Sequence, residues 1–217
     1  MIYGGAPLLP LWTALHGIFL IALFAPLHET IHRTAFRSSF LNSLVAQVAG
    51  FLLFLPPTWF RHFHLAHHAH TQDLEHDPEL ASAKPRAMGR YLLHLTGLPV
   101  WIQQARALLF AAFGVSRERF IPSSGRARVH LEARVFLGLY AFLFVVGFVL
   151  DSAFLLRLWI IPILIGQPFL RAYLLAEHTG CPLVRDMMRN TRTVESNPFV
   201  RFLAWNMPYH TEHHIFP

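Results

Sequence analysis

Residues 7–32 read PLLPLWTALHGIFLIALFAPLHETIH, an apolar run that leads without interruption into two histidines. The part from Pro7 to Leu27 is long enough to cross a hydrocarbon core, which takes about 20 helical residues. His28 and His32 follow at positions i and i+4, so a continuing helix places both imidazoles on one face. This stretch predicts a membrane helix that ends in a pair of metal-binding side chains.

The composition agrees with a membrane protein. Of the 217 residues, 54% are hydrophobic and only 14% are charged, which is more apolar than an average soluble domain. Two further segments are long and apolar enough to span a membrane, namely Arg134–Leu150 with a few added residues and Phe154–Ala176. Only residues 151–153 separate them, which indicates a tight helical hairpin. We therefore expect an all-α integral membrane helical protein, with residues 1–217 forming a single domain.

Two other apolar runs do not fit a span. Phe40–Leu55 lies between His32 and His64, and the 31 intervening residues are too few for two passes, which need about 40 helical residues and a turn. If the two histidines share a site, this run is interfacial or re-entrant. Met88–Phe113 has the same character, because charged and polar side chains interrupt it.

The basic residues predict the orientation. The formal net charge is +6, and 16 of the 18 lysines and arginines lie on or near the side that carries the histidine clusters. Arg157 lies near the hairpin tip and Arg171 lies within a span. Since positive loops stay in the cytoplasm, we expect the histidine clusters to face the cytoplasm. The polar segment 116–128 lacks the interleaved aromatic residues of a nucleic-acid groove, so no nucleic-acid partner is expected.

Two more histidine clusters follow the first. His64-Leu-Ala-His67-His68 and His210-Thr-Glu-His213-His214 repeat the pattern HxxHH, which places residues i, i+3 and i+4 on one helical face. Together with lone His178, the candidate ligands are His28, His32, His64, His67, His68, His178, His210, His213 and His214. One zinc ion takes three or four protein ligands, so nine fit two metal ions with a coordination position left for water or oxygen. Imidazole binds iron, copper, zinc and nickel alike, so ligand type alone does not select the metal.

Other ionisable residues near these clusters have secondary roles. The carboxylates that are close enough in sequence to orient the ligand rings are Glu29, Asp73, Asp77, Glu177 and Glu212. His16 and His94 are expected to be packing residues within apolar helices. The histidines expected in polar surroundings are His62, His70, His76 and His130. For His70, at i+3 from His67, replacement of a neighbouring ligand is an open alternative.

HETIH, HLAHH and HTEHH, in this order relative to the spans, resemble the three histidine boxes of the integral-membrane fatty acid desaturase and hydroxylase superfamily, which includes membrane alkane hydroxylases. The resemblance extends from the first span to Pro217 and includes Asp77-Pro78, Glu177-His-Thr-Gly and Asn206-Met-Pro-Tyr-His. It implies a non-haem di-iron centre, with two iron ions held by all nine histidines. Leu174 is a departure, because some acyl desaturases have an asparagine there that holds a water.

The resemblance implies that O₂ and external electrons are used to desaturate or hydroxylate a fatty acyl or similar lipid chain. HETIH and Glu177-His-Thr-Gly look closer to alkane hydroxylases, whereas the segment 206–217 looks more like a desaturase, which is the interpretation we favour. The sequence has no GxGxxG loop and no recognisable haem-binding domain, so a separate ferredoxin, rubredoxin or cytochrome is expected to supply electrons. The basic segments Lys84–Arg90 and Arg117–Arg128 fit an acidic donor, although membrane orientation alone also explains them.

Two interpretations from other classes remain open. HETIH is also an HExxH motif, so an intramembrane zinc protease would use Glu29 as its base and would not need His210–His214. A non-catalytic metal transporter would require polar residues across the spans, and these contain few. The sequence ends shortly after His214 and no companion span precedes the first, which is the pattern expected of a fragment truncated at one or both ends.

Overall fold

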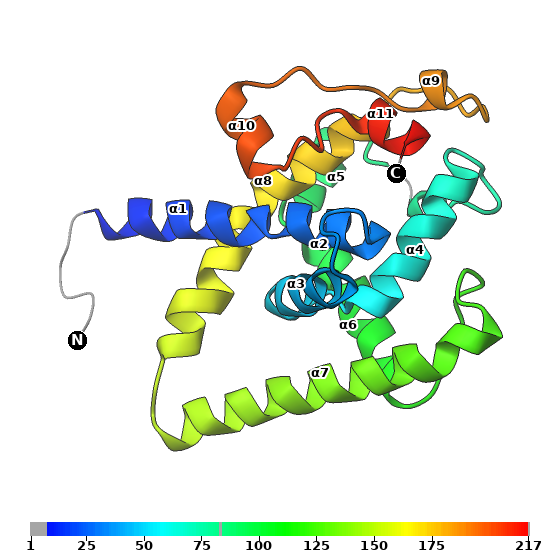
Figure 1. Ribbon diagram of the computed structural model, residues 1–217. Helices are drawn as coiled ribbons and strands as arrows, with labels where there is room; N and C mark the ends of the chain where they lie inside the picture. The colour runs from blue at the N-terminus through cyan, green and yellow to red at the C-terminus, as the bar shows by residue number, and fades with distance from the viewer. Residues whose placement is uncertain (1–7, 83, 217) are drawn as a thin grey trace.

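The computed structural model describes residues 8–82 and 84–216, and all regular elements in this part of the chain are helical (Figure 1). This confirms the predicted all-α class. The larger helices are α1 (Leu9–Ala22), α2 (Phe24–His32), α3 (Ser39–Leu52), α4 (Pro57–His70), α5 (Met88–Leu95), α6 (Leu98–Ala112), α7 (Ser123–Val149) and α8 (Ile161–His178). The short elements are η1 (Pro78–Ala81), η2 (Leu156–Ile160), α9 (Met187–Asn190), α10 (Pro198–Leu203) and α11 (His210–Ile215).

Three helical segments are long and apolar enough to cross a membrane, as predicted. They are Leu9–His32, Ser123–Val149 and Leu156–His178. The first joins α1 to α2 and so carries HETIH at its end, while the predicted starting residue Pro7 lies outside the described residues. The third joins the π-helical turn η2 to α8. In Figure 1 the hairpin between α7 and α8 lies on the left, and the histidine-bearing ends of α2, α4 and α8 lie on the right.

Three phenylalanine side chains in the second half of α7 face outward. Phe142, Phe144 and Phe148 are 62%, 74% and 80% exposed. Such large exposed apolar side chains suit contact with lipid rather than with water. The long helix α7 therefore presents a lipid-facing surface, with its start packed against α4 and α6.

The helices α1 and α8 approach each other closely where both carry glycine. A Cβ atom on Gly17 would lie 2.2 Å from the Pro162 carbonyl oxygen, and one on Gly166 would lie 2.5 Å from the Gly17 carbonyl oxygen. Small residues of this kind let the backbones of membrane helices touch. The His16 Nε2 atom lies 2.9 Å from the Leu158 carbonyl oxygen, so His16 is hydrogen-bonded as expected, but its side chain is exposed rather than packed. The crossing fixes the first span against the third.

The helices α3 and α4 meet at a sharp bend of 100°. Phe54 adopts a positive φ of 58°, and Gly50 lies so close to the Leu55 carbonyl oxygen that a Cβ atom would be 2.6 Å from it. Pro57 then starts α4, a position that suits proline because the first helical N–H has no intrahelical acceptor. The bend fits either a broken span or a re-entrant segment, so the interfacial placement of Phe40–Leu55 stays a prediction. Met88–Phe113 is divided at Gly97 into α5 and α6.

The first turn of α4 is held by a carboxylate from α7. Glu132, only 8% exposed, accepts hydrogen bonds from the Thr58 backbone N–H at 2.8 Å and the Thr58 hydroxyl at 2.7 Å. It also accepts one from the Gln47 amide of α3 at 2.6 Å. Because the first N–H groups of a helix lack intrahelical acceptors, Glu132 caps α4 from a neighbouring helix. The start of the helix that carries the second histidine cluster is thereby fixed.

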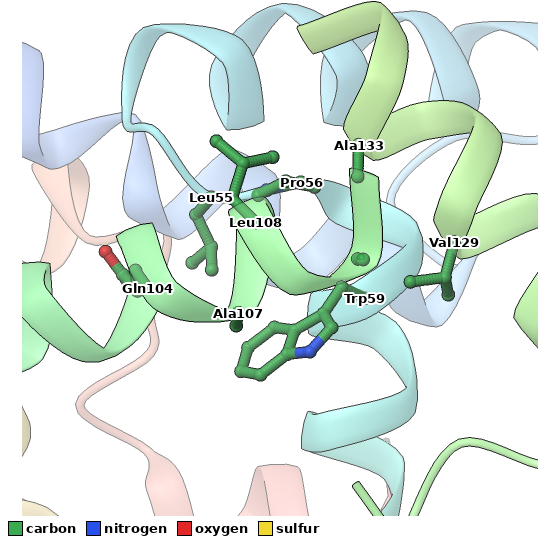
Figure 2. Close-up of a pocket in the computed structure, with 9 residues that line it drawn as sticks. Leu55, Pro56, Trp59, Gln104, Ala107, Leu108, Val129 and Ala133 are labelled. Carbon is green, nitrogen blue, oxygen red and sulfur yellow. The ribbon is translucent and has the colours of Figure 1, made fainter. Parts of the chain in front are cut away.

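Apolar packing supports the same region. Figure 2 shows Trp59 and Leu55 beside Leu108 of α6 and Ala133 of α7, around a space of about 10 Å³. That volume is roughly the minimum that one water molecule needs, so these side chains are essentially close-packed. The main core lies deeper, where Leu27, Phe60 and Leu170 pack together from α2, α4 and α8. These three helices bring the predicted metal ligands into one place.

Candidate metal centre

The nine histidines singled out from the sequence converge into two groups in which the ligand nitrogens lie within 4.8 Å of one another. The group of five consists of His28, His32, His64, His68 and His213. The group of four consists of His67, His178, His210 and His214. All members are buried except His32 and His213, which are partly buried. The whole predicted set thus meets in the interior of the molecule.

Helical periodicity explains how two clusters contribute to both groups. In α4, His64 and His68 belong to the group of five, whereas His67 belongs to the group of four. In α11 the order is reversed, because His210 and His214 join the group of four and His213 joins the group of five. A residue at i+4 lies only about 40° around the helix from residue i, whereas i+3 lies about 60° to the other side. Each HxxHH segment therefore directs two rings one way and one ring the other way.

The Nε2 atoms point inward within each group. In the group of five, the His68 Nε2 atom lies 2.9 Å from that of His64 and 3.1 Å from that of His213. In the group of four, the His178 Nε2 atom lies 3.1 Å from that of His67 and 2.9 Å from that of His210. Such clustering of nitrogen donors around two points is the arrangement expected of ligands around a pair of cations.

Several of the opposite ring nitrogens have partners outside the groups, whereas the Nδ1 atoms of His68 and His210 have no hydrogen-bond partner among the described residues. The Nδ1 atom of His28 lies 2.9 Å from the Glu29 carboxylate, and that of His67 lies 2.9 Å from the Asp77 carboxylate. In α8, the His178 Nδ1–H donates to the Asn190 carbonyl oxygen at 3.1 Å. Hydrogen bonds on the outer nitrogen fix the orientation and tautomer of a metal-binding imidazole, leaving Nε2 as the ligand atom.

Three of the five carboxylates predicted to orient the rings lie beside them. Glu29 and Asp77 make the contacts described above, and Glu177 is 3.6 Å from the His210 Nδ1 atom. Glu212 instead accepts a hydrogen bond from the Thr193 hydroxyl, and Asp73 contacts exposed His76 at 3.2 Å. Distance along the chain does not separate the carboxylates that contact a ligand ring from Asp73 and Glu212, because all five lie close to a histidine in the sequence.

Two ring partners were missed in the sequence. Asn190, fully buried in α9, holds His178 through its carbonyl oxygen and donates from its side chain to the Thr71 carbonyl oxygen at 3.1 Å. The Thr71 hydroxyl lies 3.2 Å from the His214 Nδ1 atom. Asp186 gives a recognisable start signal for the short helix α9, but nothing in the sequence relates that helix to His178.

Asp77 also organises the turn after α4. Its carboxylate accepts hydrogen bonds from the backbone N–H groups of Gln72 at 2.8 Å and Glu79 at 2.9 Å. Burial disfavours the charged carboxylate, but the contact with His67 and these backbone donors outweigh it and hold the pKa of Asp77 below its usual value. The ionised carboxylate therefore stays available to orient the His67 ring.

The imidazoles of α11 are neutral near pH 7. Burial, together with the neighbouring imidazole of His28, lowers the pKa of His213 to about 3. Burial and the adjacent rings of His214 and His178 hold the pKa of His210 well below its ordinary value. A neutral ring has a free lone pair on one nitrogen, which is the state that binds a metal ion.

Unpartnered nitrogens provide a test of whether a metal fits. The Nε2 atoms of His28 and His32 are buried and have no hydrogen-bond partner among the described residues. A buried polar atom without a partner is costly, and a cation in the group of five would satisfy both nitrogens. The donor set of five and four imidazoles suits a divalent transition metal in each group.

His70 does not join either group. It lies with Asp73 and His76 in a separate cluster in which both histidines are exposed, on the turn after α4. The exposure of His70 agrees with the polar surroundings predicted for it, and the alternative in which it replaces a neighbouring ligand is not realised in this structure. His70 is the last residue of α4, and its side chain is exposed rather than directed into the interior.

Comparison with known proteins supports the sequence resemblance. The family model described as fatty acid desaturase matches residues 5–217. The chain is also similar to the sphingolipid delta(4)-desaturase of Candida albicans, with 26% identity over 216 residues that cover 90% of this chain and 54% of that protein. The chain thus spans about half the length of this curated relative.

Proposed function

The chain belongs to the fatty acid desaturase family, and from this premise we propose that it is a membrane-bound, O₂-dependent oxidoreductase that uses two non-haem iron ions to desaturate a lipid chain. The observation that carries the proposal is the convergence of nine imidazoles into two groups, each with its nitrogen donors within 4.8 Å of one another. The three apolar spans support a lipid substrate that approaches from the bilayer.

The proposed ligands are the members of the two groups already described. Iron bound there supplies the activation of O₂ that removing hydrogen from an unactivated carbon requires. The protein contributes orientation, because Glu29, Asp77 and Asn190 hold ligand rings from behind. It also contributes exclusion of water, since seven of the nine histidines are buried.

Desaturation would remove two hydrogen atoms from adjacent carbons and reduce O₂ to two molecules of water. Two of the four electrons come from the broken C–H bonds, and the other two come from outside together with two protons. A separate ferredoxin, rubredoxin or cytochrome is the proposed donor, because no redox cofactor motif is present in the sequence. We propose that it docks from the cytoplasm, the side on which the positive-inside rule predicts the histidine clusters to lie.

Hydroxylation of a lipid or alkane chain is the second candidate, since it begins with the same removal of hydrogen. The desaturase interpretation is favoured by the similarity to a sphingolipid desaturase. An intramembrane zinc protease is disfavoured, because Glu29 contacts the Nδ1 atoms of His28 and His213, at 2.9 and 3.7 Å, behind the ring nitrogens that converge. A protease base would lie on the other side, next to the metal-bound water.

The test is expression with iron and a redox donor, followed by mass analysis of host lipids. We expect a lipid that has lost two hydrogens, whereas a gain of one oxygen would indicate hydroxylation. His213→Ala should abolish the product, and His130→Ala, whose ring contacts Ser116 outside both groups, is the matched control. One zinc ion per chain, with activity surviving His213→Ala, would overturn the di-iron proposal.

A further inference from the structure

A cavity of about 450 Å³ lies beside the metal centre. Its lining includes Phe24, Phe60, Phe63 and Leu174, which are four residues before His28, His64, His67 and His178. Four residues make about one helical turn, which advances about 5.4 Å. In α2, α4 and α8, the side chains that line the cavity therefore lie one turn before the histidines of the candidate metal centre. The ring of Phe60 lies 5.6 Å from that of His64, and the ring of Phe24 lies 6.0 Å from that of His28. The cavity therefore adjoins both groups.

Most of the cavity wall is apolar, but three cations line it. They are Arg171 of α8, Arg90 of α5 and Lys84, and they face one carboxylate, that of Glu79. The apolar wall suits an aliphatic chain, and its volume lies in the range of about 300–1,000 Å³ that small-molecule sites occupy. The excess of cations suits a negative group on that chain.

Arg171 is the most unusual of these cations. It lies within the span Leu156–His178, and its Nε atom is buried without a hydrogen-bond partner among the described residues. Ionisable residues within membrane helices are costly and usually pair with another group or serve a bound ligand. No carboxylate in the described part of the chain forms an ion pair with Arg171 within 4.0 Å. Its guanidinium is therefore available to a ligand in the cavity.

We propose that this cavity binds a single aliphatic chain that carries an oxyanion, a carboxylate or a phosphate, and that Arg171 is the residue that pairs with the anion. Arginine presents its N–H groups in a planar fork that matches both kinds of oxyanion. That this ligand is the substrate rests on the proposed function. The substrate class is then anionic lipids, and uncharged alkanes are excluded. Binding itself requires no oxidation.

Quenching of Trp59, which lines this cavity and is drawn in Figure 2, reports binding directly. The full chain in a neutral detergent would be titrated with 9,10-dibromostearic acid and with its uncharged methyl ester, because bromine quenches indole fluorescence on contact. Trp59→Phe identifies the part of the quenching that arises in the cavity. We expect the acid to bind at least about tenfold more tightly than the ester, as a charge-assisted hydrogen bond allows.

Arg171→Gln should remove that preference. The affinity for the acid should fall about tenfold, while the affinity for the ester stays as in the wild type. Arg171→Lys should restore part of it, and Arg157→Gln, on the same span at the hairpin tip, should behave as wild type. Ester binding shows that the cavity of the variant is intact. Equal binding of acid and ester by the wild type would overturn the inference whatever the variants do, and so would an unchanged preference in Arg171→Gln.

Competition distinguishes the two sources of the anion. Palmitate that displaces the brominated acid better than hexadecyl phosphate indicates a carboxylate ligand, and the reverse order indicates a phosphate. Displacement by hexadecanol as effective as by either anion would contradict a role for charge. His213→Ala should bind the acid normally although oxidation is lost, so failure of the binding inference and failure of the proposed function are separately visible.

Discussion

Replacing Glu132 by glutamine should loosen α4, the helix that contributes histidines to both groups. The carboxylate accepts three hydrogen bonds, two from Thr58 at the start of α4 and one from Gln47 of α3. Glutamine has nearly the same shape but offers one acceptor oxygen and one amide nitrogen. The amide nitrogen then either faces the Thr58 backbone N–H, which can only donate, or forces the Thr58 hydroxyl and the Gln47 amide to reverse their roles, in a site that is only 8% exposed.

The size of the effect follows from these contacts. Hydrogen bonds between membrane helices average about 0.6 kcal/mol, so loss of all three would cost about 2 kcal/mol. Losing one hydrogen bond to a charged group, worth roughly 1.5–3 kcal/mol, gives a similar value. For a chain of this size each kcal/mol moves the melting temperature by about 2–4 °C, so Glu132→Gln should lower it by about 4–8 °C.

The assay is thermal unfolding of purified protein in detergent, followed by size-exclusion chromatography of the heated samples. Glu118→Gln is the control, because Glu118 also contacts α4 but only at 3.5 Å from the Trp59 indole nitrogen and in a partly exposed position. Identical melting of Glu132→Gln, Glu118→Gln and the wild type would refute the idea that Glu132 caps α4. A drop in both variants alike would instead attribute the loss to net charge.

Three further effects follow from the structure. The metal-free protein should lose stability as pH falls from 6.5 towards 4, because His210 and His213 stay neutral in the fold while the same residues bind protons in the unfolded chain. Each histidine lowers the free energy of unfolding by up to about 1.4 kcal/mol per pH unit. Melting temperatures that do not change with pH would contradict this. Gly166→Leu should destabilise the protein by about 1–3 kcal/mol or more, since its Cβ atom would collide with the Gly17 carbonyl oxygen, whereas Gly138→Leu, with nothing within 4 Å, should melt as wild type. Asp77→Asn should weaken iron(II) binding about 10–100-fold in a metal titration by freeing the His67 ring, and Asp73→Asn, which touches only exposed His76 and the turn beside it, should not.

The spans and the candidate ligands could be predicted because both depend on local sequence. A run of about 20 apolar residues is long enough for a membrane helix, and histidines at i and i+4 point the same way whatever surrounds them, whereas the ring at i+3 turns to the other group. The ring partners depend instead on how distant segments meet. Thr71 and His214 are 143 residues apart, and Asn190 reaches Thr71 from 119 residues away. Only the folded arrangement of α4, α9 and α11 brings them together.

The charged residues of the apolar helices were the least predictable. Glu132 and Arg171 both interrupt spans, and the sequence gives no sign that one caps a helix and the other lines a cavity. The difference arises from the neighbour, since Glu132 meets the free N–H groups at the start of α4, whereas Arg171 meets a space between helices. A charged residue within a span is recognisable in the sequence as unusual, but its role depends on which groups the folded structure places next to it.

The division of the histidines has a consequence for how the two groups depend on each other. The helices α4 and α11 contribute to both groups, whereas α2 contributes only to the group of five and α8 only to the group of four. Any change that displaces α4, such as Glu132→Gln, should therefore weaken metal binding in both groups together. His28→Ala and His178→Ala should each affect one group first, because the remaining helices still hold the other. In the proposed two-metal centre, α4 and α11 thus support both groups, and α2 and α8 each complete one of them.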